Sequence, residues 1–452
     1  MIDQAEDTDN LGAAFRKLKG EPAVTFGLFS MRLRPRVLAT AVILILMAPF
    51  TLSALGQHHS ASPTRDPNCP PLQGGFSDIF DFSLQQQNGG AASNLAIDRA
   101  GNFCGALAVG GTHTEGLLYK LAQRGQGWVF DPLYNFLGGS NAGHPVNVVL
   151  GPGGVLYGGA ASGGIQACGN DGDSYCGVVY SSNPGPTACN TALCGWLETT
   201  LYQFTGNTDA WGGTVSAFDS AGNLYGISLN GGALGQGAIF ELTRSQEGWT
   251  EQVIYSFTGG SDGSNPSSLL VGHDGNLYGT ALHGGLCCGT VFQLTQSEGS
   301  WSEHVLHTFE HIYTSYDPGG LIQDQAGNLY GFAQWSIGGV YLAVVYELSP
   351  SGGGWQFTQL INPLHRPDCD GNNLPRALAL ASGHLYLGSG GIDDDCMPLD
   401  SGEIYDVTVQ TYVVEGNVDI FQNMTPDANG NLYGASAACG NNGGGMVWKL
   451  TP

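Results

Sequence analysis

The chain has 452 residues, of which 72 are glycine and only 12% are charged. Glycine is costly inside helices and common in turns, so this composition argues against a helical protein. The formal net charge is −24, and six of the fourteen Lys and Arg residues lie before position 57, so the rest of the chain is strongly acidic. Because binding to phosphate needs clustered basic residues, we expect no nucleic-acid partner and no anionic lipid surface. The plainest role of this charge is to keep the protein soluble, with cationic ligands better suited than anionic ones.

The N-terminal region has the layout of a secretory signal peptide. A basic segment at 31–36 precedes an apolar run at 37–48 that is too short to span a membrane comfortably, and small residues follow at 53–56. An uncleaved N-terminal anchor is the alternative, and would be the protein's one contact with a membrane. We therefore expect a protein that is secreted, periplasmic or on the cell surface. The predicted segments are an extension at 1–30 that is not translated if Met31 is the start, a signal peptide or anchor at 31–56, a linker at 57–72 and a folded domain at 73–452.

A short repeat dominates the folded domain. Its core is Gly-Asn-Leu-Tyr-Gly, and seven copies begin at Gly101, Gly154, Gly222, Gly275, Gly327, Gly383 and Gly430. Most copies are separated by roughly 50 residues, close to the length of a four-stranded propeller blade. Short β-branched and aromatic runs bounded by turn residues surround each copy, so every copy reads as a set of strands.

The residues around each motif predict a hairpin. An aspartate lies three residues before the motif glycine at Asp98, Asp219, Asp324 and Asp427. Aspartate can accept hydrogen bonds from the turn backbone, and glycine adopts the left-handed conformation that closes the turn. We therefore interpret these four carboxylates as turn residues rather than as a ligand array, and the aromatic residues as core packing.

The two ends of the domain predict a closed ring. The last copy stops at Pro452 after its third strand, whereas the domain begins with 76–82, which matches a fourth strand without a blade. Pairing between these two segments would leave no unpaired edge. The predicted fold is therefore all-β, a seven-bladed β-propeller of four-stranded blades that an N-terminal strand closes by completing the last blade. We expect it to be a monomer.

Eleven cysteines in an exported chain indicate disulfides. The expected pairs are Cys168 with Cys176, Cys189 with Cys194, and Cys369 with Cys396. Cys287 and Cys288 form either a vicinal bridge or two separately used thiols. Cys69, Cys104 and Cys439 remain, and one cysteine stays unpaired within a monomer. Zinc is the weaker interpretation, because the chain has no Cys-x2-Cys pair.

Candidate sites lie in the loops that interrupt the repeat, on the face that holds the connections between strands two and three and between blades. Three of these loops are acidic, and calcium is the one cofactor they suggest, through Asp171, Asp173, Asp368, Asp370, Asp393, Asp394 and Asp395. No complete calcium-loop spacing is present, so solvated acidic loops are the competing interpretation. Histidines of the same face are candidate ligand-binding residues: His113, His144, His283 and His365.

The repeat resembles the GloVer tandem repeat of bacterial surface proteins. The similarity rests on Ile254-Tyr-Ser-Phe-Thr-Gly-Gly-Ser-Asp-Gly263, Gly275-Asn-Leu-Tyr-Gly-Thr280, the Gly284-Gly285 pair and Gly289-Thr-Val-Phe-Gln-Leu294, and it extends in weaker form over 73–452. The resemblance implies an exported propeller and no established enzymatic role. Lactonase-like and sensor-type propellers share similar hairpins, so the motif indicates the fold more strongly than the function.

The sequence contains no nucleophile, metalloprotease or phosphate-loop motif. We therefore predict a noncatalytic propeller that binds an extracellular ligand or envelope component (a glycan, a protein or a cation) through one loop face. The alternatives are an enzyme that acts on a carbohydrate or lactone in the propeller mouth, and a purely structural envelope protein.

Overall fold

The computed structural model describes the chain in thirteen ranges, all of which lie after residue 74. They are residues 75–83, 90–125, 127–168, 174–184, 195–206, 208–285, 288–310, 317–337, 340–361, 373–391, 402–414, 423–436 and 443–452. The predicted extension, signal peptide and linker therefore lie outside the described residues. No helix in the described ranges is long and apolar enough to cross a membrane.

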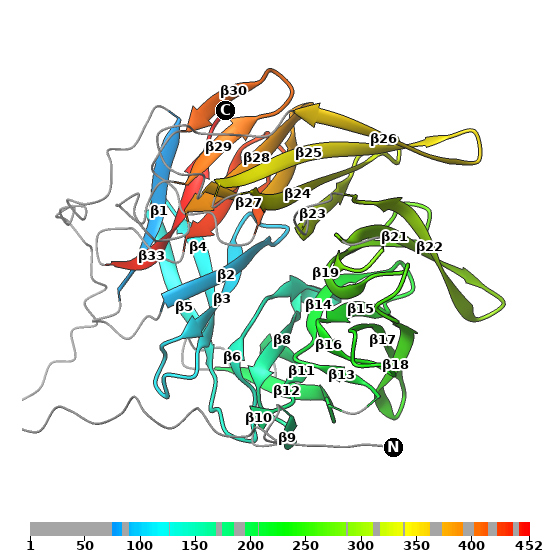
Figure 1. Ribbon diagram of the computed structural model, residues 1–452. Coiled ribbons are helices and arrows are strands. Elements are labelled where there is room, and N and C mark those ends of the chain that lie inside the picture. The colour runs from blue at the N-terminus through cyan, green and yellow to red at the C-terminus, as the bar shows by residue number, and fades with distance from the viewer. Residues whose placement is uncertain are drawn as a thin grey trace, which may run out of the picture. The chain divides into compact units, whose positions relative to one another are not determined.

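Seven of the antiparallel sheets formed by the described residues have four or five strands each and are the blades, which confirms the predicted seven-bladed propeller; two small two-stranded sheets accompany them. Figure 1 shows the sheets following one another in chain order, from cyan through green and yellow to red. From the inner to the outer strand, blade 1 holds β2 (Gly90–Ile97), β3 (Phe103–Val109), β4 (Leu117–Arg124) and β5 (Gly127–Asn135). Blade 2 holds β6 (Gly143–Pro145) and β7 (Val149–Leu150) at its inner position, then β8 (Leu156–Ser162), β11 (Val178–Pro184) and β12 (Trp196–Gln203). Blade 3 holds β14 (Thr214–Phe218), β15 (Leu224–Ser228), β17 (Ala238–Ser245) and β18 (Gly248–Ser256).

The remaining blades repeat this order. Blade 4 holds β19 (Ser264–Val271), β20 (Leu277–His283), β21 (Thr290–Ser297) and β22 (Ser300–Thr308). Blade 5 holds β23 (Asp317–Gln323), β24 (Leu329–Ile337), β25 (Val340–Ser351) and β26 (Gly354–Ile361). Blade 6 holds β27 (Asn373–Ala381), β28 (His384–Gly391), β29 (Glu403–Asp406) and β30 (Thr411–Val414). Blade 7 holds β31 (Met424–Pro426), β32 (Leu432–Ser436), β33 (Gly443–Leu450) and, as its outer strand, β1 (Phe76–Ser83).

The ring closes as the sequence predicts. Strand β1 pairs antiparallel with β33, from Phe76 opposite Leu450 to Ser83 opposite Gly443, and Figure 1 shows the blue strand beside the red one. Contacts between neighbouring blades complete the circuit, because β31 and β32 of blade 7 contact β2 of blade 1. At this junction the Leu95 amide donates to Asn423 Oδ1 at 3.3 Å, and Thr425 Oγ1 donates to the Leu95 carbonyl at 3.0 Å.

The motif residues have two structural roles. At each of the four predicted turns the aspartate accepts hydrogen bonds from the backbone, as where Asp219 Oδ1 accepts from the amides of Ala221 and Asn223 at 2.9 Å each. The second motif glycine makes room for an aromatic ring of the third strand. A Cβ on Gly279 would overlap the Phe292 ring, and the same relation joins Gly226 to Phe240. The motif therefore specifies hairpin closure and core packing, as the sequence predicts.

Candidate functional site

The propeller has two faces that differ in their connections. Because the strands within a blade are antiparallel, the connections between strands two and three lie at the same end as the connections between blades. We call this end the loop face. It holds three of the four predicted histidines: His113 in the connection after β3, His144 in β6 and His283 at the end of β20. His365 lies outside the described residues.

On the loop face, His144 contacts polar side chains of two blades. Its Nδ1 lies 3.2 Å from Glu115 Oε2 of blade 1 and 3.2 Å from Ser162 Oγ of blade 2. Its backbone is in the left-handed region with φ 50°, and its amide donates to the Glu115 carbonyl at 2.7 Å. Left-handed geometry is uncommon for a residue with a side chain and accompanies functional sites. The three residues form what we call the His144 cluster.

The cluster fixes which nitrogen of the ring is available. Both contacts of His144 within the described residues use Nδ1. A proton on Nδ1 suits the neighbouring Glu115 carboxyl group, and in that neutral tautomer Nε2 is the acceptor. The His144 side chain is 45% exposed, and no hydrogen bond to Nε2 occurs within the described residues. The cluster can therefore accept a hydrogen bond from a ligand hydroxyl or amine at the surface.

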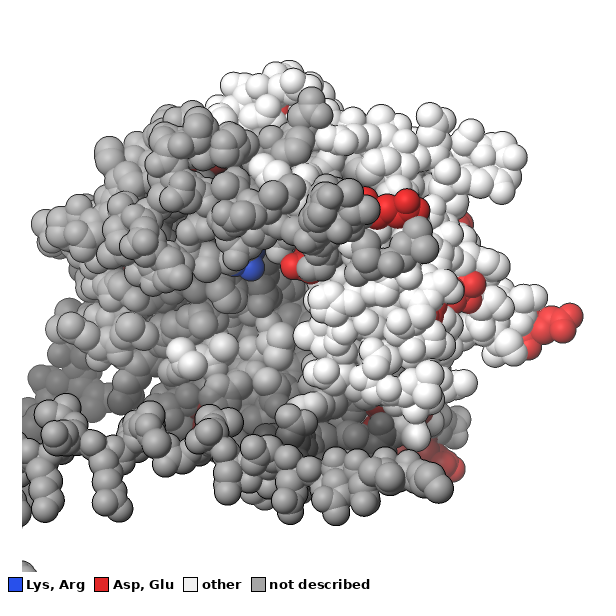
Figure 2. Space-filling view, viewed as in Figure 1, with Lys and Arg blue, Asp and Glu red and all other residues white. Residues whose placement is uncertain are grey.

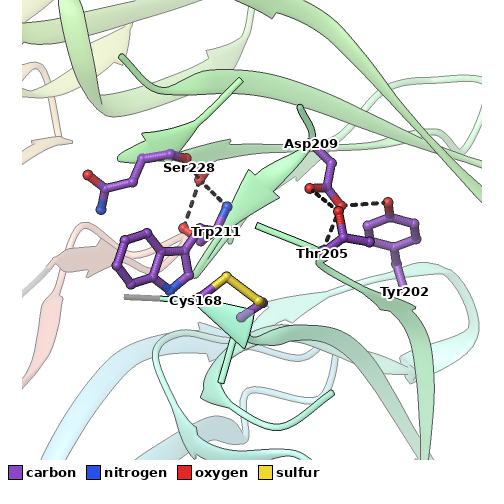
Figure 3. Close-up of a disulfide and its surroundings, with 8 residues drawn as sticks. Cys168, Tyr202, Thr205, Asp209, Trp211 and Ser228 are labelled. Atoms are coloured by element: carbon purple, nitrogen blue, oxygen red, sulfur yellow. Dashed lines mark hydrogen bonds between the residues drawn. A yellow bond between two sulfur atoms is a disulfide. The ribbon is translucent and has the colours of Figure 1, made fainter. Parts of the chain in front are cut away.

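A disulfide stabilises the neighbouring part of the loop face. Cys168 and Cys176 are bonded, as predicted, and close a small hairpin formed by β9 (Gln166–Cys168) and β10 (Ser174–Tyr175). Both sulfur-bearing residues are buried with Ala210 and Phe204, and the half-buried Trp211 packs against the same group. Figure 3 shows the disulfide between the Trp211 indole and the Tyr202–Thr205–Asp209 group. Ser228 Oγ accepts from the Trp211 amide at 2.8 Å and donates to its carbonyl at 2.7 Å.

Asp209 is a structural residue rather than a free ligand. Its carboxylate is buried and accepts hydrogen bonds from the Tyr202 hydroxyl at 3.0 Å and from the amide and hydroxyl of Thr205 at 2.8 and 2.7 Å. Asp262 is held in the same way by Tyr255 and Thr258 one blade further on. Burial raises the pKa of Asp262, but these hydrogen bonds outweigh it and hold the pKa below its usual value. The Asp262 carboxylate therefore stays ionised inside its turn.

Two glutamates beside these turns have a raised pKa, in contrast to Asp262. Burial, together with the charge of Asp209, raises the pKa of Glu251 to about 7, and burial with the charge of Asp262 raises the pKa of Glu303 to about 7. The Tyr202 hydroxyl gives its one proton to Asp209, so a hydrogen bond between Tyr202 and Glu251 needs a protonated Glu251. These acids lie between blades and were not identified as candidates from the sequence.

The other predicted site residues either have few contacts or lie outside the described residues. His113 is exposed, with Nδ1 3.0 Å from Thr112 Oγ1. Burial raises the pKa of Asp317, and the charge of His283 offsets part of this rise. All seven aspartates of the predicted calcium loops lie outside the described residues, as do Cys189, Cys194, Cys369 and Cys396. Within the described ranges, no three His, Cys, Asp or Glu residues come together as a metal site.

Two further cysteines have defined states. Cys104 is free and buried, and it takes the place of the motif tyrosine in blade 1. Cys288 is disulfide-bonded. On the face drawn in Figure 2, acidic side chains of the described residues appear as separate red spots, and a single blue spot marks a basic side chain.

Seven blades that carry one sequence repeat define a repeat β-propeller protein. The chain belongs to the Gloeobacter/Verrucomicrobia repeat family, whose profile matches residues 166–391. This confirms the resemblance drawn from the motif. No curated protein matches the chain in sequence.

Several solved structures resemble the chain at low identity. A PL25 ulvan lyase bound to -[GlcA(1-4)Rha3S]- has 10% identity and a TM-score of 0.47, over 80% of this chain and 94% of that one. An alpha-L-arabinanase of Penicillium chrysogenum complexed with arabinobiose has 11% identity and a TM-score of 0.42, over 75% of this chain and 100% of that one. An endo-arabinase of Bacteroides thetaiotaomicron has 13% identity and a TM-score of 0.31, over 60% of this chain and 95% of that one. At such identities no ligand or activity carries over.

Proposed function

We propose that the protein is a noncatalytic propeller that binds a neutral glycan on its loop face. The observation that supports this most is the His144 cluster, in which Glu115 orients a half-exposed imidazole toward use as a hydrogen-bond acceptor. Trp211 provides an aromatic surface at the entry of the next blade, beside the disulfide-closed hairpin. An apolar ring face beside oriented polar groups suits a sugar, which has both apolar and hydroxyl-bearing surfaces.

The charge of the chain narrows the class of glycan. The formal net charge of −24 disfavours sulfated or uronic-acid polymers close to the protein surface, within the screening length of about 10 Å. Neutral sugars escape this repulsion. Secretion and a place in the cell envelope remain part of the proposal, on the basis of the N-terminal segment.

An enzyme that acts on a carbohydrate or lactone is the second candidate. Its support is the same cluster, because a carboxylate-oriented histidine can act as a general base through Nε2. Ser162 and Glu115, however, both contact Nδ1, so Ser162 is not placed at the nitrogen that would activate it in a catalytic triad. Binding therefore explains the geometry with fewer requirements than catalysis.

The test is a glycan array followed by calorimetry with the full chain and its His144→Ala and Trp211→Ala variants. We expect binding to neutral glycans, weakened about tenfold by either substitution, which corresponds to the loss of one good contact of about 1.4 kcal/mol. His273→Ala is the matched control, because His273 is an exposed histidine in the turn after β19, on the opposite face. Absence of binding to every neutral glycan, or binding that neither variant weakens, would overturn the proposal. Turnover of a glycan or lactone lost in His144→Ala would establish the enzyme instead.

A further inference from the structure

One position of the blade recurs on the loop face with polar residues. It is the residue before the proline that opens the inner strand, and we call it the rim position. His144 holds it in blade 2, Asn265 in blade 4 and Asp317 in blade 5. The strand register shows that these positions are equivalent, because the prolines that follow lie opposite matching alanines: Pro145 with Ala160, Pro266 with Ala281 and Pro318 with Ala333.

The backbone at two of these positions has the same unusual geometry. Asn265 has φ 55°, next to 50° for His144. The Asn265 amide donates to the Gln236 carbonyl of the preceding blade at 2.8 Å, as the His144 amide donates to Glu115. Both side chains therefore leave the backbone in the same direction relative to their own blades.

The side chains at the rim position share one chemical property. Asn265 Nδ2 donates to the Leu229 carbonyl of blade 3 at 2.9 Å, which orients the amide and leaves Oδ1 as an acceptor. His144 offers Nε2 in the same sense. Asp317 is half-buried and offers a carboxylate, with His283 near enough to influence its charge. Each of the three positions thus presents an acceptor that a hydroxyl can use.

Blade 3, which follows blade 2 and precedes blade 4, has a glycine instead of a polar residue at its rim position. Its rim position is Gly212, whose amide donates to the Cys176 carbonyl at 2.9 Å, and the residue just before it is Trp211. The rim of four consecutive blades therefore runs from an acceptor to an aromatic surface and then to two further acceptors. A chain of sugars has a hydroxyl or an apolar face for each of these positions.

We infer that the ligand is a linear neutral polysaccharide that lies along the rim of blades 2 to 5 and contacts His144, Trp211, Asn265 and Asp317 in turn. This inference rests on the proposed function and deepens it, because it names a polymer and adds two subsites. Repeated contacts on one chain raise its apparent affinity well above that of a short fragment, since later contacts form at high local concentration.

The test compares short and long members of the cello-, xylo-, manno- and malto-oligosaccharide series by calorimetry with the full chain. We expect affinity to rise with length, and Asn265→Ala and Asp317→Ala each to weaken the longest oligosaccharide about tenfold while leaving the disaccharide unchanged. His144→Ala should weaken short and long ligands alike. His273→Ala serves as control, and melting curves establish that each variant is folded.

Two outcomes separate the inference from the function beneath it. Binding that depends on His144 and Trp211 but is equal for short and long oligosaccharides, or insensitive to Asn265→Ala and Asp317→Ala, overturns the polymer inference and leaves the proposed function standing. Absence of binding to all four series and to the glycan array overturns both.

Discussion

The glycine at the end of the motif offers the sharpest test of the packing that the repeat specifies. In blade 4 a Cβ on Gly279 would overlap the Phe292 ring and lie 2.5 Å from the Ser268 carbonyl oxygen. Phe292 is fully buried, and the Ser268 carbonyl belongs to the inner strand, so neither can yield without moving a blade. Gly275, four residues earlier, has φ 82° and no atom within 4 Å of the added Cβ. Gly275→Ala therefore reports the backbone cost alone, whereas Gly279→Ala reports the packing.

The expected magnitudes differ enough to measure. Overpacking a core typically costs 1–3 kcal/mol, and the carbonyl contact puts Gly279→Ala at about 3 kcal/mol. The left-handed residue in Gly275→Ala costs about 1 kcal/mol. An unfolding entropy of about 2.1 cal/mol/K per residue over about 375 residues converts these values to Tm decreases of about 4 and 1 °C. Calorimetric melting of both variants and of Gly279→Ala with Phe292→Leu checks this, because the smaller side chain should recover part of the loss. Equal Tm values for the two alanine variants would refute the packing role.

Three further predictions follow from the fold. The raised pKa of Glu251 and Glu303 means that folding binds protons between about pH 4.5 and 7, so their contribution to stability falls as pH rises through that window and is constant above it. Glu251→Gln should therefore raise Tm at pH 8 and not at pH 4. Burial lowers the pKa of His307 to about 4, which has the opposing effect on stability, and comparing each variant with wild type at the same pH cancels it. The exposed control Glu247→Gln should show no difference in Tm between the two pH values. Replacing Cys168 and Cys176 by serine should lower the free energy of unfolding by about 2.5 kcal/mol, because the disulfide closes a short loop, and should lower Tm by about 3 °C. An unchanged Tm would show that the disulfide does not stabilise the fold. Phe82→Ala should lower the free energy of unfolding by about 4 kcal/mol, because this β1 side chain is fully buried against Tyr119 of blade 1. Limited proteolysis of the variant should then cut near β1 first. First cleavage elsewhere would contradict the role of β1 in closing the ring.

The features that the sequence predicts are those that each repeat contains within itself. A hairpin needs only an aspartate, two or three turn residues and a glycine, as in Asp219 to Gly222, so its structure can be read from adjacent positions. The closure by β1 follows from counting strands at the two ends. The Cys168–Cys176 bond joins residues eight positions apart, which also makes it a local feature.

The His144 cluster could not be predicted in the same way, because its three residues come from two blades. His144 was identified as a candidate by its place in a loop, but Glu115 and Ser162 are 29 and 18 positions away and have no fixed spacing to it. Glu251 and Glu303 were missed for a related reason. Each lies two residues after the tryptophan that opens an outer strand, a repeated signal that is visible once the blades are superimposed in sequence. Their raised pKa arises from the burial between blades, which no single repeat reveals.

The pairing of β1 with β33 sets an order for biogenesis. The first described strand of the propeller leaves the ribosome long before the last one, and its partner appears only when Gly443–Leu450 has been made. Until then β1 has no partner strand, and unpaired strand edges are templates for aggregation. Closure is thus a late, long-range step that slows folding, since contacts between distant segments form last. We expect the chain to be most exposed to aggregation before this pairing, after which β1 and β33 cover each other.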